Sequence, residues 1–399
     1  MLSDEPYLDF AALTLDSNIL RGQRYNFDGG ILKQLEQFSG SPVEIIQPDV
    51  IHFEGVTHLS YEISEALKGA RSNLKALGRY VEVDGFTSSH LGPDVSPKEL
   101  AEHKLNQFYK RINGRVIPSS EADVGTLMKM YFNSQPPFDT VKDKKYEFPD
   151  AVALLALENW AITNQKKMVL VSKDKGWRAF ANNSPLLHVV EEVSDALSLF
   201  QPHTKVKELI ALLQSEGLLE INSALFKSIS DEIKERAVSQ EPTIDAGSFL
   251  NFEYDDVQIE YVGHKFASHT ADEKLRIAIV LIEEDRVVLS LNTLVTIKVT
   301  AQFAFTQYDS IDKDYVPLGG ALEQRTASYE ADVLLHFEGD WTDVPNHLLL
   351  GEIEIQGELE HVEFGDVGPD YSQEHEEQQR WEYEWDQEKD RRRTEDSKY

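Results

Sequence analysis

The chain has 399 residues, of which 41% are apolar, so it is long enough for two or three folded domains. The absence of cysteine excludes disulfide bonds, thiolate zinc sites and cysteine nucleophiles. The net charge of −31 argues against a nucleic-acid partner, but residues 1–200 contain 27 acids and 21 bases and carry only −6, which leaves −25 for the rest. A nucleic-acid substrate at the N-terminal half is therefore compatible with the charge.

The same composition bears on localisation. No run of residues approaches the roughly 20 apolar residues that a membrane span needs. The first residues include Asp4 and Glu5, where a cleaved signal peptide would carry basic residues. These features predict a cytoplasmic protein without a membrane partner.

Residues 8–200 alternate between strand-like and helix-like segments, which predicts an α/β domain with a parallel sheet flanked by helices. Short apolar runs predict strands at 11–15, 43–47 and 168–172. Pro48 and Asp49 predict a helix start after the second strand. A longer insertion follows at about 60–145, with helices predicted at 61–80, 98–110 and 121–132 around a loop at 85–97.

Four acidic residues stand where these predicted elements begin or end. Asp16 closes the first strand, and Asp174 follows the strand that begins at Met168. The carboxyl ends of parallel strands face one crevice, so these two acids are expected to converge. Glu54 falls on the helix that starts near Asp49, and Asp150 lies in the first turn of an apolar helix at 147–163. A helix N-terminus also favours a carboxylate, so capping is an equal alternative for Asp150.

The local sequences around these acids resemble the PIN-domain nucleases, in the branch with a large insertion and an extra C-terminal β-rich domain. The resemblance covers about the first 200 residues, and its four motifs follow in the family's order: Leu15-Asp16-Ser17-Asn18, Val50-Ile51-His52-Phe53-Glu54, Glu147-Phe148-Pro149-Asp150-Ala151 and Val169-Leu170-Val171-Ser172-Lys173-Asp174. It departs from the family at Ser17 and Ser172, where threonine is common, and in the long spacing between the second and third acids.

The resemblance implies a metal-dependent catalytic site. Asp16, Glu54 and Asp150 would be the principal ligands of Mg²⁺ or Mn²⁺, and Asp174 a further ligand or a supporting acid. Clustered carboxylates repel one another unless cations neutralise them, and hard oxygen ligands select these metals. Asn18 and Ser172 would orient the acids or a bound water, and Glu147 would assist, with a purely structural surface role as its alternative. Substrate contacts are expected from Lys173, Lys175 and Arg178.

Histidine chemistry is a weaker reading of the chain. His52, His58 and His90 have no nucleophile in a recognisable setting, so each is interpreted as a packing or surface residue. His264 and His269 lie in a loop-like segment with no acidic metal motif around them.

The C-terminal half changes character. Residues 201–246 are predicted to be a helical connector, 247–366 an antiparallel β-rich domain with strands near 257–261, 295–299 and 353–355, and 367–399 a charged tail. An acidic and amide stripe runs from Glu352 to Glu360 and is either a recognition surface or a solvated edge. This acidic half is a candidate surface for a protein partner, for self-association, or for holding the active site inhibited.

The sequence thus predicts a metal-dependent nuclease that acts on RNA rather than DNA, because RNA cleavage is the commoner activity among the proteins it resembles. The extra domain suggests a toxin-like or antiviral defence role. The alternative is a non-catalytic scaffold or regulatory binding protein that retains a PIN-like fold.

Overall fold

The computed structural model describes residues 10–77, 96–138, 144–201, 210–211, 213–214, 223–268, 275–310, 313–339 and 349–370. Most of the predicted loop at 85–97, most of the helix predicted near 205–213, His90, His269 and the tail from 371 lie outside these residues. The chain forms two compact units: unit 1 comprises 1–220, 268–292 and 332–356, and unit 2 comprises 221–267, 293–331 and 357–399. Each unit combines segments that are separated in the sequence, whereas each predicted domain is one continuous segment.

A five-stranded parallel sheet lies at the centre of unit 1. Its strands are β1 (Phe10–Leu15), β2 (Glu44–Pro48), β3 (Gly114–Ile117), β4 (Lys167–Val171) and β5 (Leu187–Val190), in the order β3-β2-β1-β4-β5. The two outer strands have four residues each and were not predicted. The parallel α/β fold expected from the sequence is confirmed.

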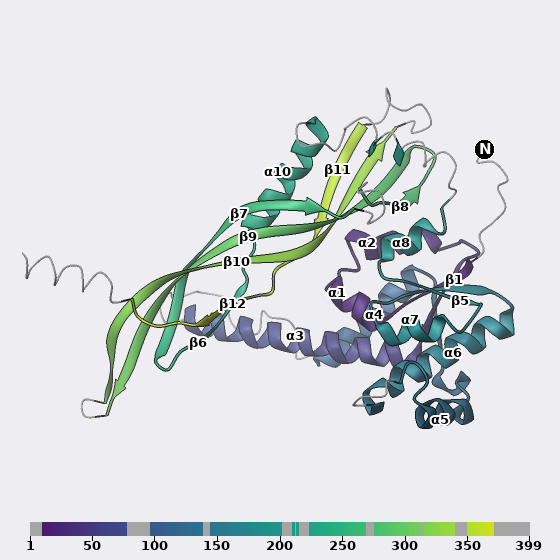
Figure 1. The fold of residues 1–399 in the computed structure, drawn as a ribbon, viewed down its shortest axis with the longest axis horizontal. Helices are drawn as coiled ribbons and strands as arrows, with labels where there is room; N and C mark the ends of the chain where they lie inside the picture. Colours follow the sequence, from purple (N-terminus) through teal and green to yellow (C-terminus); the bar gives the residue numbers. More distant parts are fainter. Residues whose placement is uncertain are drawn as a thin grey trace, which may run out of the picture. The chain divides into compact units, whose positions relative to one another are not determined.

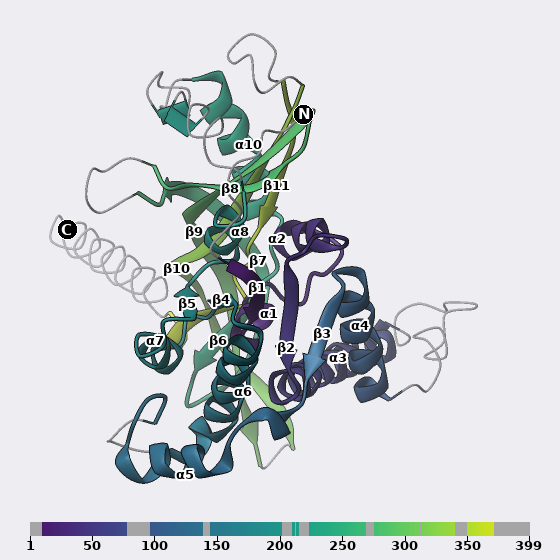
Figure 2. The same cartoon turned by 90° about the vertical axis from the view of Figure 1, so that its right-hand side faces the viewer.

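Helices cover both faces of this sheet (Figures 1 and 2). On one side lie α2 and α8, and on the other α6. The described helical elements of unit 1 include α1 (Ser17–Gly22), α2 (Gly30–Lys33), η1 (Gln34–Phe38), α3 (Asp49–Leu77), α4 (Pro97–Arg111), η3 (Ser119–Glu121), α5 (Val124–Asn133), η4 (Lys144–Glu147), α6 (Phe148–Asn164), α7 (Lys175–Ala181) and α8 (Val193–Ser198).

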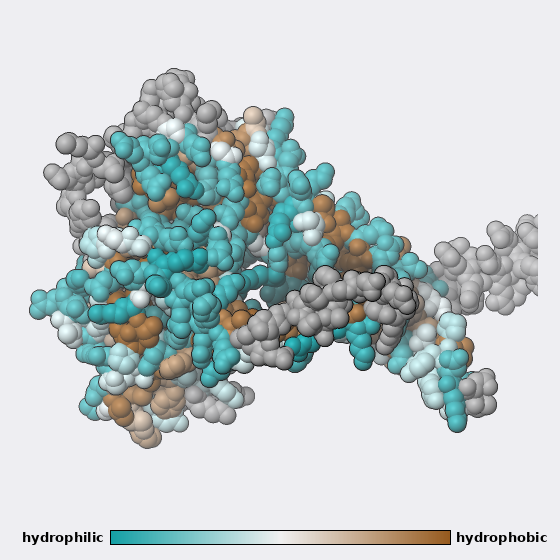
Figure 3. Space-filling view, turned by 180° about the vertical axis from the view of Figure 1, so that it is seen from behind, coloured by the Kyte–Doolittle hydropathy of each residue, from teal (hydrophilic) through white to brown (hydrophobic). Residues whose placement is uncertain are grey.

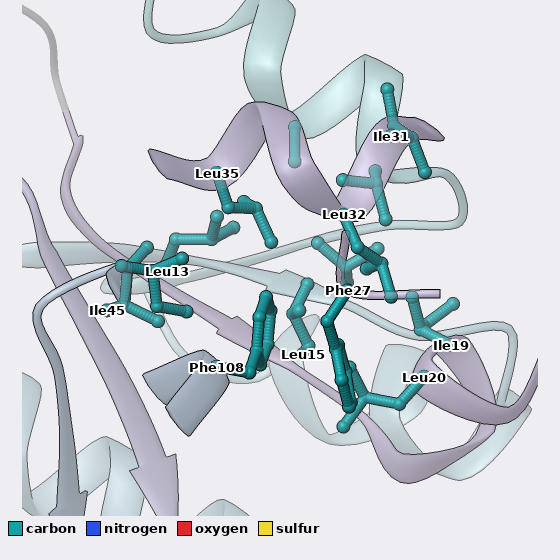
Figure 4. Close-up of a cluster of buried hydrophobic side chains, with 14 of the residues drawn as sticks. Leu13, Leu15, Ile19, Leu20, Phe27, Ile31, Leu32, Leu35, Ile45 and Phe108 are labelled. Carbon is teal, nitrogen blue, oxygen red and sulfur yellow. The ribbon is translucent and has the colours of Figure 1, made fainter. Parts of the chain in front are cut away.

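Strand alternation directs side chains into two cores. Leu13 and Leu15 of β1 pack in one cluster with Ile45 and with Phe108 of α4, as Figure 4 shows. Ala12, which directly precedes Leu13 on the strand, belongs to the opposite cluster with α6 residues. Successive side chains of a strand point to opposite faces, so a strand buried on both faces reads as a continuous apolar run.

The segment predicted as an insertion contributes to this sheet. It contains β3, whose residues Gly114–Ile117 pair in parallel with Ile45–Pro48 of β2. Before β3, α4 begins with a capping box in which Ser96 accepts from the Glu99 N–H and Glu99 accepts from the Ser96 N–H. Residues 96–117 are therefore part of the α/β core.

The later strands form mainly antiparallel pairs, as predicted. One sheet has the order β11-β10-β9-β7, with β8 also paired to β9, and a second sheet pairs β12 with β6 in parallel. The strands are β6 (Thr243–Gly247), β7 (Asn251–Phe266), β8 (Ile277–Ile282), β9 (Arg286–Asp309), β10 (Asp314–Glu338), β11 (Leu349–Gln356) and β12 (His361–Asp366).

Part of this antiparallel sheet completes unit 1. Strands β8 and β11, the start of β9 and the end of β10 belong to it. Val280, Leu281, Val288 and Leu334 lie in the same buried cluster as Leu13 and Leu15 of β1. One face of the parallel sheet therefore depends on residues more than 250 positions away in the chain.

Polar contacts fix this part of the sheet to α2. Glu354 accepts a hydrogen bond from the Gly30 N–H at 2.5 Å, and Gln356 accepts one from the Ile31 N–H at 3.2 Å. At Gly30, where φ is +58°, an added Cβ would lie 1.7 Å from the Gln356 side chain. The pKa of Glu354 is lowered, mainly by the hydrogen bond that its side chain forms with His336. Two members of the predicted acidic stripe thus contact the protein's own helix N-terminus.

Leu334→Ala tests whether β10 stabilises unit 1. Leu334 is fully buried in the cluster shared with β1, so its truncation is expected to lower the free energy of unfolding by about 2–5 kcal/mol. Leu322→Ala, on the same strand but 65% exposed, is the control and should change it by less than about 0.5 kcal/mol. Equal effects in denaturant unfolding would contradict the shared core.

Unit 2 contains α10 (Ala224–Val238), which lies within the predicted connector and packs on β7.

In Figure 3 the surface is mostly hydrophilic, with hydrophobic patches. On α5 of unit 1, Val124, Met128 and Phe132 are exposed. Within the described part of the chain, every helix is too short or too polar to span a bilayer.

Candidate metal-binding active site

Asp16 lies at the carboxyl end of β1, immediately before α1. Its N–H donates to the Val171 carbonyl at 3.0 Å, which continues the pairing of β1 with β4. The side chain is only 4% exposed, and one carboxylate oxygen accepts a hydrogen bond from the Ser172 hydroxyl at 2.5 Å. Ser172 itself is fully buried. The end of β4 therefore orients the carboxylate at the end of β1.

Glu54 reaches Asp16 through Ser17. The Ser17 hydroxyl donates to Glu54 at 2.8 Å and lies 3.4 Å from the second carboxylate oxygen of Asp16. Glu54 stands in the second turn of α3, with Nε2 of His58 at 4.0 Å from its other oxygen. One hydroxyl thus links the helix-borne acid to the strand-borne acid.

Asp150 lies in the first turn of α6, where its hydrogen-bond partner is the indole N–H of Trp177 at 2.8 Å. Glu147 occupies the N-cap position of this helix without a capping hydrogen bond from its side chain. The helix N-terminus favours the negative charge at Asp150, and Trp177 holds one of its oxygens. Capping and ligand roles are compatible at this residue.

Asp174 caps α7. One carboxylate oxygen accepts from the N–H groups of Gly176 at 2.6 Å and Trp177 at 3.1 Å, and the Asp174 N–H donates to Ser172 at 3.0 Å. A Cβ at position 176 would lie 2.9 Å from that oxygen and 3.0 Å from Pro137, so glycine allows the close turn. The cap also positions the Trp177 ring that holds Asp150.

The pKa values of Asp16 and Asp150 reflect their burial and the charges of other acids in the predicted set. Burial is the largest cause that raises the pKa of Asp16, to about 6, and Glu54 and Asp174 raise it further against the opposing hydrogen bond from Ser172. Burial likewise raises the pKa of Asp150 to about 7, with contributions from Asp16, Asp174 and Glu54 against the hydrogen bond from Trp177. Asp16 and Asp150 are thus less stable in their ionised forms, first because they are buried and then because other acids are near.

This donor set fits a hard divalent cation. All of its donors are carboxylate oxygens, and a cation would offset both the burial of charge and the repulsion that raise the pKa values of Asp16 and Asp150. In the described ranges, however, no three His, Asp or Glu side chains already have the spacing of a metal centre. Ser172 and Ser17 instead contact the two oxygens of Asp16, Ser17 also bonds Glu54, and Trp177 bonds one oxygen of Asp150.

The other predicted site residues differ in exposure and in whether they form ion pairs. Asn18 is exposed on α1, and a hydrogen bond from its backbone, not its side chain, lowers the pKa of Asp16. Lys173 forms an ion pair with Glu192 at 2.9 Å, and Arg178 forms one with Glu191. Lys175 is exposed at the first residue of α7. Neighbouring acids therefore reduce the positive charge predicted for substrate contacts.

Two residues of the site were not predicted. In the sequence, Ser17 was noted only because threonine is common at this position of the family. In the structure, its hydroxyl bridges Glu54 and Asp16. Trp177 gave no sequence signal beyond an apolar residue three positions after Asp174, because its bond to Asp150 joins α7 to α6. Both residues act by orienting carboxylates.

Trp177→Phe tests the hold on Asp150. The change removes the N–H donor but keeps an aromatic ring in a fully buried position, and it is expected to lower the free energy of unfolding by about 1.5–3 kcal/mol more at pH 8.5 than Trp160→Phe. The control is matched because the buried indole N–H of Trp160 has no hydrogen-bond partner among the described residues. Equal costs of the two substitutions in denaturant unfolding would show that the bond does not stabilise ionised Asp150.

Comparison with known proteins identifies part of unit 1. The family model of the PIN domain matches residues 13–177, a range that includes all four acids. No curated protein and no solved structure matches the chain. The match ends at Trp177, so the C-terminal strands of unit 1 lie outside it.

Proposed function

Because residues 13–177 form a PIN domain, we propose that this chain is a metal-dependent nuclease that hydrolyses phosphodiester bonds, with RNA as its substrate rather than DNA. The observation that carries the proposal is that burial, together with the charges of neighbouring acids, raises the pKa values of both Asp16 and Asp150. Carboxylates whose pKa values are raised by burial and by nearby acids are typical of a functional site.

The proposed metal ligands are Asp16, Glu54 and Asp150, with Asp174 as a further ligand or a supporting acid. When bound there, Mg²⁺ or Mn²⁺ would lower the pKa of a water molecule and offset the charge that develops on the phosphate. The hydrogen bonds from Ser172 and Trp177 orient the Asp16 and Asp150 carboxylates that would hold the metal. Lys175 is the exposed base proposed to contact the phosphate backbone.

The choice of RNA follows the commoner activity in the family that the motifs resemble. A toxin-like or antiviral defence role, control by the acidic C-terminal region and a protein partner or self-association through it stay predictions from the domain composition. The cytoplasmic localisation also stays a prediction.

A cleavage assay on the full chain tests the proposal. Labelled RNA and DNA of the same sequence would be incubated with Mg²⁺, with Mn²⁺ and with a chelator, and thermal unfolding would be followed under the same conditions. We expect cleavage of RNA and a raised unfolding temperature only with metal. If neither polymer is cleaved and the metals do not stabilise the fold, the non-catalytic scaffold is favoured.

A further inference from the structure

Two exposed aromatic side chains lie on α3 next to the candidate active site. Phe53 directly precedes Glu54 and is 62% exposed, and Tyr61 is 67% exposed. Eight residues of helix separate them by about 12 Å along the axis. Between them Thr57 is exposed, and its hydroxyl donates back to the Phe53 carbonyl at 2.8 Å. We call Phe53 and Tyr61 the α3 aromatic pair.

The core packing of α3 does not need this pair. Ile51, Gly55, Val56 and Leu59 are the buried residues of the helix. Val56 and Leu59 belong to one core cluster and Ile51 to the other. A single exposed apolar residue is common on a protein surface, but two large aromatic rings beside a candidate metal ligand present two flat faces to solvent at a site proposed to bind a polymer.

The continuation of α3 is basic. From Ala66 to Leu77 the helix contains Lys68, Arg71 and Lys75 and no acid. Lys68 is paired with Glu65 at 2.6 Å, whereas Arg71 and Lys75 form no ion pair with any of the residues that the structure describes. Along the helix, Phe53 and Glu54 are followed by Tyr61 with the acids Glu62 and Glu65, and the positive charge of Arg71 and Lys75 comes after them. This charge is complementary to a phosphate backbone.

We propose that the α3 aromatic pair is a base-stacking platform for single-stranded nucleic acid, with the backbone of the strand continuing toward Arg71 and Lys75. Unpaired bases stack on aromatic side chains without sequence preference, whereas the bases of a duplex have their faces covered by their neighbours. The platform would select unpaired regions of the substrate. This inference rests on the proposed nuclease function and adds the class of substrate to it.

Binding measured apart from cleavage tests the platform. In the full chain carrying Asp16→Asn, fluorescence anisotropy would compare a labelled 12-nucleotide single strand with an abasic strand of the same length. Phe53→Ala and Tyr61→Ala are each expected to weaken binding of the base-containing strand by about 5- to 100-fold and to leave the abasic strand unaffected. Phe249→Ala is the control, because Phe249 is 90% exposed and lies in unit 2.

The outcomes separate this inference from the proposed function. Unchanged binding in both α3 variants, or an equal loss for the two strands, would overturn the platform even if the wild-type protein cleaves RNA. A base-dependent loss in a protein that cleaves neither polymer would support the platform and contradict the nuclease. Unchanged unfolding temperatures of the variants establish that the fold is intact.

Discussion

Asp16→Asn is expected to abolish metal-dependent cleavage, with a loss of about 10²- to 10⁴-fold in rate. The substitution keeps the size of the side chain and removes the charge of the buried acid at the centre of the site. Electrostatic stabilisation by a bound metal contributes several kcal/mol to the transition state, and each 1.36 kcal/mol is a factor of ten in rate. The measurement is single-turnover cleavage of labelled RNA at saturating Mn²⁺.

The design needs an isosteric control. Asp28→Asn makes the same change on a carboxylate of unit 1 whose side chain is 70% exposed, and it should leave the cleavage rate within about twofold of the wild type. Asp16→Asn is also expected to abolish stabilisation by metal, which thermal unfolding detects. A variant at Asp16 that cleaves at the wild-type rate would remove this residue from the catalytic set.

Asp150→Asn is expected to change the pH dependence of stability in the metal-free protein. Burial raises the pKa of Asp150 from 3.8 to about 7, so the folded state binds the proton more tightly than the unfolded chain does. The stability contributed by the protonated form is fully present below about pH 4 and is lost as the pH rises to about 7. A shift of three pKa units corresponds to about 4 kcal/mol, and the wild type should lose about 2–4 kcal/mol relative to the variant across this range.

The difference between the two proteins is the quantity to measure, because other groups titrate in the same range. Burial lowers the pKa of His52 and His264, which adds stability as the pH rises, but these residues are common to both proteins. Denaturant unfolding between pH 4 and 8 in a chelator gives the difference. Mg²⁺ or Mn²⁺ should remove the loss in the wild type, since the cation binds the ionised acids. A difference that stays constant with pH would contradict the burial of a raised-pKa carboxylate at position 150.

The local sequence was sufficient for most elements of the α/β fold. The apolar runs at 11–15, 43–47 and 168–172 correspond to β1, β2 and β4 within one residue at each end. The outer strands β3 and β5 were not found, because four residues are too few to show a period of two and their pairing partners are distant in sequence. The same reason explains why the segment at 60–145 was predicted to be a plain insertion.

By itself, the sequence determined the parallel sheet, the PIN-domain resemblance and the four acids, because each depends on residues close together in the chain. Only the tertiary structure decided that Asp16 and Asp150 have raised pKa values, since desolvation and the charges of other acids come from separate strands and helices. It also decided that Trp177 holds Asp150 and that Leu334 completes the core beside β1. Packing brings these residues together over long sequence separations, and a local sequence pattern does not indicate which distant residue will contact it.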